Sequence, residues 1–222
     1  MRLKQVAPRV YLVTFKDRHT LGMTFLRCQE YYESPKFRGE FFKLFDYIDW
    51  YSRYQSKDGT FSYTKDLLGF NVPGHVVHTV VNMLHDSVYD LSTKYDEIMY
   101  KIYKKLYTRH GENFYLIGVS EEGSKGGQVI EHETAHGLYS TDIKYRVEMS
   151  ILLKSLPRDI KKRLHRLLSK MGYHRHTQLD EIHAYLSTGM TRDMKKVRGI
   201  RIWANKFQKL FKQLKQESKE NE

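Results

Sequence analysis

Apolar residues recur at helical spacing through most of the second half of the chain, and this pattern constrains the fold more than any other feature. The clearest stripe consists of Tyr95, Ile98, Met99, Ile102, Tyr103 and Leu106. Its i, i+3, i+4 spacing is that of a helix with one buried face. Further helices are expected at about 128–138, 141–155, 157–171, 177–187 and 191–216, and 114–120 is the best strand candidate. We therefore expect an α+β fold, mainly helical, with a small layer of strands preceding the helix at 128–138.

The first third of the chain has a mixed pattern. Val10–Phe15 and Met23–Cys28 are rich in residues that favour strands, and together they predict a hairpin. Aromatic residues at helical spacing predict a helix over 39–54, and 61–64 predicts a short strand. After Pro73 and Gly74 a helix is expected, and Ser92 is the expected N-cap of a helix that ends before Gly111.

Length and composition exclude several classes of protein. At 222 residues and 40% hydrophobic content, the chain can bury about 70% of its unfolded surface, so folding alone requires no disulfide or metal. Cys28 is the single cysteine, which excludes a multi-thiolate metal site and fits a reducing compartment. Residues 1–8 lack the apolar run of a signal peptide, and no apolar stretch of 18 residues occurs. We expect a cytoplasmic protein with no transmembrane segment.

Residues His132-Glu133-Thr134-Ala135-His136 spell HExxH inside an expected helix. Residues four apart on a helix share one face, with Cβ atoms about 5–6 Å apart, so both imidazoles can reach one Zn²⁺. Glu133 can reach a zinc-bound water without binding the metal, and it can take the proton of that water and deliver it to a leaving amine. The motif predicts His132 and His136 as metal ligands and Glu133 as the catalytic base.

The order of strand 114–120, glycine-rich turn and HETAH helix resembles the zincin metallopeptidases over roughly residues 114–187. The resemblance implies a zincin-like fold, a Zn²⁺ cofactor, and hydrolysis of a peptide or protein substrate. It also implies that 114–120 is an edge strand. In that family the edge strand binds an extended peptide through its backbone, so Leu116–Ser120 would be the rim that faces the substrate.

A catalytic zinc needs a third protein ligand. The segment Glu181-Ile182-His183-Ala184 resembles the ExxA segment of the gluzincins, in which a second helix supplies a glutamate, so the resemblance implies Glu181 as that ligand. The metzincin pattern would place the ligand at Asp142, although Tyr139 stands where that pattern has glycine. Asp180 is a further alternative for the ligand. Tyr185 replaces the Asp that orients a ligand histidine in many gluzincins, and Asp180 could take that orienting role.

An oxyanion donor opposite the metal is also required, and His183, Tyr185 and His174 are the candidates. His174 belongs to the segment 173–176, for which we expect a solvated loop. A second enzyme motif, His85-Asp86, is similar to the HD phosphohydrolases, but the chain lacks the spaced downstream ligands of that family.

The net charge of +12 is concentrated at the C-terminal end. Residues 191–216 carry +8 and the other 196 residues carry +4. An apolar stripe from Ile200 to Leu214 predicts a docked helix, and its basic faces make 191–216 a candidate surface for an anionic partner such as nucleic acid. Two alternative functions follow: a nucleic-acid-associated, SprT-like zincin, or a non-catalytic binding protein that acts through this helix.

We accordingly divide the chain into three parts. Residues 1–90 are expected to form the N-terminal α+β part of the same domain, 91–190 the zincin-like metal-binding core, and 191–222 the basic amphipathic C-terminal helix.

Overall fold

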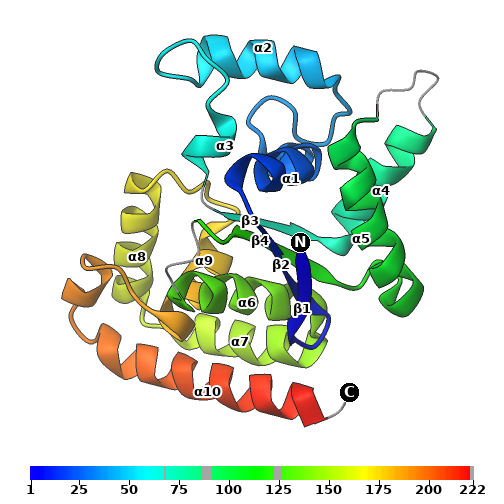
Figure 1. The fold of residues 1–222 in the computed structure, drawn as a ribbon. Coiled ribbons are helices and arrows are strands. Elements are labelled where there is room, and N and C mark those ends of the chain that lie inside the picture. The colour runs from blue at the N-terminus through cyan, green and yellow to red at the C-terminus, as the bar shows by residue number, and fades with distance from the viewer. Residues whose placement is uncertain (68, 87–91, 123–126, 221–222) are drawn as a thin grey trace. The chain divides into compact units, whose positions relative to one another are not determined.

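The structure is a computed structural model, and it describes residues 1–67, 69–86, 92–122 and 127–220. Over these residues the chain forms four strands, ten α-helices and one short 3-10 helix (Figure 1). The fold is therefore α+β with a majority of helix, as expected. None of the helices within these ranges is long and apolar enough to cross a membrane.

The four strands all lie in the first 120 residues, interspersed with five helices. The strands are β1 (Arg2–Ala7), β2 (Val10–Phe15), β3 (Gly69–Pro73) and β4 (Tyr115–Ser120). The first five helices are α1 (Arg18–Glu33), α2 (Leu44–Tyr54), α3 (Tyr63–Asp66), α4 (Gly74–His85) and α5 (Lys94–His110). The remaining helices are α6 (Gly127–Thr141), α7 (Ile143–Ser155), α8 (Arg158–Lys170), α9 (Gln178–Thr188), the 3-10 helix η1 (Met194–Lys196) and α10 (Ile200–Glu220).

The chain separates into two compact units. Residues 1–5 and 11–125 form unit 1, and residues 6–10 and 126–222 form unit 2. Unit 1 has a core rich in aromatic side chains, including Phe25, Tyr47 and Tyr63, and α1 also buries the carboxylic acid Glu30. Unit 2 has its own apolar residues, among them Met149 and Phe207, which are completely buried.

The four strands form one mixed sheet in the order β1-β2-β4-β3. β3 and β4 are antiparallel, with Gly69 opposite Val119 and Pro73 opposite Tyr115. The predicted strand at 114–120 is confirmed as β4, but β4 has a hydrogen-bonded neighbour on each side. A peptide adds to a sheet only at an edge with unpaired backbone groups. The expectation that Leu116–Ser120 is an edge strand facing a substrate is therefore wrong.

The predicted strand over Met23–Cys28 is also wrong, because these residues lie in α1. Every residue of α1 from 21 to 30 is buried, so the helix shows no apolar stripe and its sequence looks like a buried strand. Asp17 begins the helix, because its side chain accepts a hydrogen bond from the Thr20 N–H at 2.7 Å. The expected strand at 61–64 is replaced in part by α3, and β1 was not anticipated.

The helices expected from apolar spacing are confirmed, with shifts at their ends. Thr93 rather than Ser92 caps α5, in a capping box completed by Asp96. The single helix expected over 191–216 is divided into η1 and α10. Gly199 lies between them with a φ of 80°, a conformation that ends a helix and that glycine adopts without strain.

Candidate metal centre

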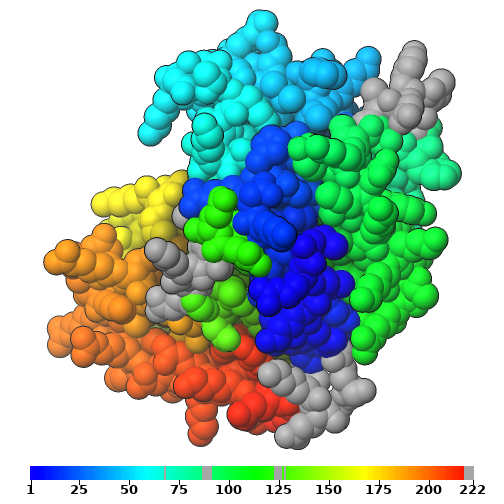
Figure 2. Space-filling model, viewed as in Figure 1, coloured from blue at the N-terminus to red at the C-terminus, as the bar shows by residue number. Residues whose placement is uncertain are grey.

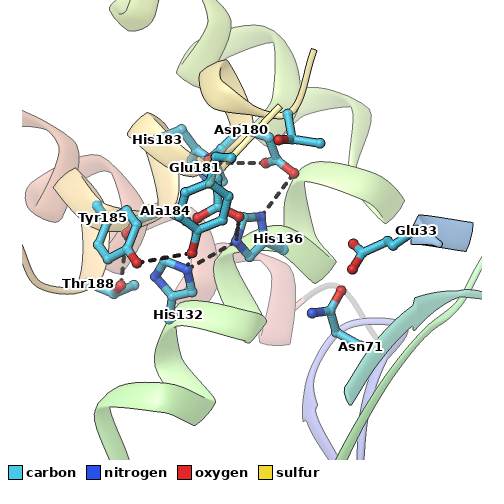
Figure 3. A network of polar contacts seen from close by, with 12 residues as sticks. Glu33, Asn71, His132, His136, Asp180, Glu181, His183, Ala184, Tyr185 and Thr188 are labelled. Carbon is cyan, nitrogen blue, oxygen red and sulfur yellow. Dashed lines mark hydrogen bonds and ion pairs between the residues drawn. The ribbon is translucent and has the colours of Figure 1, made fainter. Parts of the chain in front are cut away.

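The HETAH residues lie on α6, and α9 packs against that helix in unit 2. Ala135 on α6 and Ala184 on α9 are completely buried. Such small side chains allow two helices to approach closely. Figure 3 shows the consequence: His132 and His136 from one helix point toward Asp180 and Glu181 from the other.

Three side chains bring their ligand atoms together at this contact. The Nε2 atoms of His132 and His136 lie 3.2 Å apart, and Glu181 places Oε2 at 3.5 Å from the first and Oε1 at 3.5 Å from the second. Zinc bonds of about 2.0–2.1 Å at tetrahedral angles place ligand atoms about 3.4 Å apart. One donor atom from each of the three residues lies within 4.8 Å of the other two, near this spacing, so this set of residues could hold the metal that the motif predicts.

The carboxylates of the site provide a second test of that fit. Oε2 of Glu181 and Oε2 of Glu133 are buried and have no hydrogen-bond partner within the described chain. A buried polar atom without a partner costs about 1–3 kcal/mol, and a charged one costs more. A bound cation would compensate Glu181 directly. Glu133 lies beside the ligands, where its oxygen can instead accept a hydrogen bond from a small molecule in the site.

A chain of hydrogen bonds extends from His136 into the interior of unit 2. Nδ1 of His136 lies 2.9 Å from Oδ2 of Asp180, whose Oδ1 lies 3.1 Å from Nδ1 of His183. Nε2 of His183 lies 3.0 Å from the Tyr145 hydroxyl. Because Asp180 accepts from both rings, each Nδ1 carries a proton. Nε2 of His136 is therefore the ring atom that faces the possible metal position. Nε2 of His183 accepts a hydrogen bond from the Tyr145 hydroxyl.

The charges of this chain support the same arrangement. Burial would raise the pKa of Asp180, but His136 and His183 together hold it well below its usual range, so Asp180 is a carboxylate. Burial alone would lower the pKa of His136, and the carboxylates of Asp180, Glu181 and Glu133 raise it to about 9, so a metal that binds at Nε2 would displace a proton from this ring. Burial lowers the pKa of His183, which is therefore neutral. Asp180 thus holds the His136 ring in one orientation, as the orienting role that the sequence offered it would require.

A cavity of about 310 Å³ opens beside the three ligands. It is lined by Val129, His132, Glu133, Tyr173, Tyr185, Thr188 and Gly189, all in unit 2. The hydroxyls of Tyr173 and Tyr185 lie 3.2 Å apart. Burial raises the pKa of both phenols, so both remain protonated hydrogen-bond donors at neutral pH. The cavity thus combines a histidine that could bind a metal, a buried carboxyl group and two phenolic hydroxyls.

The other candidates from the sequence lie elsewhere. Asp142 caps α7 by accepting from the Tyr145 N–H at 3.0 Å. Within the described ranges two groups of side chains could hold a metal, and Asp142 belongs to neither; they are His132, His136 and Glu181, and His136, Asp180 and His183. His183 is buried in the hydrogen-bonded chain, and His174 is exposed and stacks on His176. Of the three candidate oxyanion donors, Tyr185 is the one that lines the cavity.

Two residues of the site were not anticipated from the sequence. Tyr173 lines the cavity, although 173–176 was expected to be a solvated loop, and Tyr145 ends the hydrogen-bonded chain. No local pattern marks either tyrosine, since Tyr173, in the loop after α8, and Tyr145, on α7, both reach the site through contacts with α9. His85 and Asp86 are exposed, and neither joins a metal-ligating group in the parts of the chain that are described.

Comparisons with models of protein families, with curated proteins and with solved structures find no match to this chain. Its function must therefore be inferred from the residues of the site themselves.

Proposed function

We propose that the protein hydrolyses peptide bonds with a zinc ion held by His132, His136 and Glu181, and with Glu133 as the general base. One observation carries the proposal. Donor atoms of the two histidines and of Glu181 lie close enough together to share one ion, and the adjacent Glu133, which lines the cavity with His132, has a buried oxygen with no partner in the described chain. When bound there, zinc would supply a Lewis acid and lower the pKa of a water toward about 7.

Glu133 is suited to proton transfer by its surroundings. Burial raises the pKa of its carboxyl group, and the charges of His136 and His132 oppose that rise. A carboxyl group whose pKa is moved toward neutrality can both accept and release a proton efficiently. In the proposed reaction Glu133 takes a proton from the attacking water. It then passes that proton to the nitrogen that leaves when the peptide bond breaks.

Tyr185 is the proposed donor to the carbonyl oxygen, which gains negative charge as water attacks. Its hydroxyl lies in the cavity with Glu133 and is held 3.2 Å from the hydroxyl of Tyr173. A donor fixed before the reaction stabilises this developing charge without reorganisation. Tyr173 is a positioning residue for Tyr185, because their hydrogen bond limits the rotation of the Tyr185 hydroxyl.

Metal analysis tests the ligand assignment. We expect one zinc per chain in the purified protein, and a large loss of zinc in His132→Ala. Zinc retained in full by this variant would remove His132 from the ligand set.

Glu133→Gln tests the base separately. It should retain zinc and lose hydrolysis of a denatured protein substrate. The matched control is Glu131→Gln, since Glu131 lies on the same helix but pairs with Lys215 at 2.7 Å. Unchanged hydrolysis in Glu133→Gln would exclude Glu133 as the base.

A further inference from the structure

Helix α8 exposes a row of like charges. Arg158, Lys162, Arg166 and Lys170 follow one another at i, i+4 spacing, and all four are exposed. At 1.5 Å per residue the row is about 18 Å long, with a cation about every 6 Å. The opposite side of α8 is apolar, and its residues Ile160, Leu164 and Leu168 are buried in unit 2.

A second basic segment runs alongside α8 in the opposite direction. Near the end of α8, the pKa of Asp193 is lowered by its bond to Lys196 and also by the charge of Lys170. Near the start of α8, Gly199 lies against Ile160. Residues 193–199 therefore end beside the first turn of α8, and the two segments lie at the surface, yellow and orange, in Figures 1 and 2. This segment adds the exposed Lys195 and Arg198.

Few carboxylates balance this surface. Lys196 pairs with Asp193 at 2.6 Å. In the part of the chain that the structure describes, no carboxylate lies within ion-pair distance of Arg158, Lys162 or Arg166. Like charges at i, i+4 destabilise a helix, so this row works against the stability of α8. Residues that destabilise their own helix are characteristic of a surface that binds a partner.

We propose that the surface formed by the α8 row and residues 193–199 binds the phosphate backbone of nucleic acid. The closely spaced cations match a polyanion, and binding would release the counterions that such a polymer condenses. A helix that lies on a lipid membrane inserts apolar residues next to its cations. On α8 that apolar side is already buried in unit 2. The proposed surface includes α8, which lies outside the basic segment 191–216 expected from the sequence, and it does not depend on the metal centre.

The test measures the fluorescence anisotropy of a labelled 20-base-pair DNA duplex, and of one of its single strands, across a range of salt concentrations. We expect the full chain to bind the duplex, the single strand or both, with an affinity that falls as the salt concentration rises. In the double variant Lys162→Gln/Arg166→Gln, the slope of log K against log salt should fall by about two. The apparent Kd at 100 mM salt should rise at least tenfold.

The matched control is Lys209→Gln/Lys212→Gln, which removes the same charge from exposed positions of α10. It should retain at least half of the wild-type affinity, and circular dichroism should show both variants folded. Three results would overturn the proposal: wild-type affinity in the α8 variant, an equal loss in the α10 variant, or binding to phosphatidylserine-containing vesicles but to neither DNA.

Discussion

The hydrogen bond between Asp180 and His136 gives a prediction whose size can be derived from the structure. The two oxygens of Asp180 accept from His136 at 2.9 Å and from His183 at 3.1 Å. In Asp180→Asn one carboxylate oxygen is replaced by an NH2 group, which can only donate, so a single acceptor oxygen remains. His183 retains the main-chain oxygen of residue 180, at 2.9 Å, as another acceptor. The amide oxygen should therefore turn toward His136 and preserve a neutral bond, whereas Asp180→Ala removes the bond entirely.

Loss of a group that orients a metal ligand costs about 10- to 100-fold in affinity, or about 1.4–2.7 kcal/mol. A hydrogen bond to a charged acceptor is about twice as strong as a neutral one. We therefore expect the zinc Kd to rise about tenfold in Asp180→Asn and about a hundredfold in Asp180→Ala. Competition with a chromophoric zinc chelator at one fixed pH measures both values.

Asp142→Asn is the control for these variants. Asp142 is the N-cap of α7, and asparagine caps a helix as well as aspartate does, so both zinc affinity and the melting temperature of the metal-free protein should remain unchanged. The reasoning fails if Asp180→Ala binds zinc within twofold of the wild type. It also fails if Asp142→Asn loses as much affinity as Asp180→Ala.

Three further predictions concern buried polar groups. Tyr145→Phe removes the last hydroxyl of the hydrogen-bonded chain behind His136 and should weaken zinc binding several-fold. Tyr139 is the control, because its ring also contacts His183 but its hydroxyl bonds Ser150, so Tyr139→Phe should not weaken zinc binding. Burial raises the pKa of the Cys28 thiol to about 12, so a thiol reagent at pH 8 should label the denatured protein and leave the native protein unmodified over the same period. Burial also raises the pKa of Glu30 above its unfolded value of about 4.5, so the wild type should lose stability as the pH rises above 4.5. Glu30→Gln cannot titrate at this position, so the difference in urea midpoint should grow in its favour as the pH rises from 4.5 through the folded pKa of Glu30 and should then level off. A difference that stays constant from below pH 4.5 upward would contradict this account.

Local sequence patterns predicted much of the fold and the first part of the site. The apolar stripe of α5, its capping residues and its terminal glycine could be predicted because they depend on interactions within one helix. The placement of both HETAH histidines on one face could be predicted for the same reason. The α1 helix was missed because burial on all sides removes the periodicity that distinguishes a helix from a buried strand. The interior position of β4 was missed because strand order depends on pairing between distant segments.

The rest of the site shows the same limit. Glu181 was suggested by a resemblance between short segments, and its approach to His132 depends on how α6 and α9 pack. The choice among Asp142, Asp180 and Glu181 could not be made from spacing alone. The structure adds that Asp142 caps a helix and that Asp180 faces an imidazole nitrogen, and these contacts favour Glu181 as the proposed ligand.

The position of Glu181 on α9 also has a consequence for local unfolding. His136 and Glu181 are 45 residues apart in the sequence, and the segment between them contains all of α7 and α8. An ion shared by α6 and α9 would bind only when both helices are in place, so it would stabilise that pairing in proportion to its free concentration. Amide hydrogen exchange in α9 would then slow when the metal binds. The time for which this half of the chain stays folded would increase with the free metal concentration.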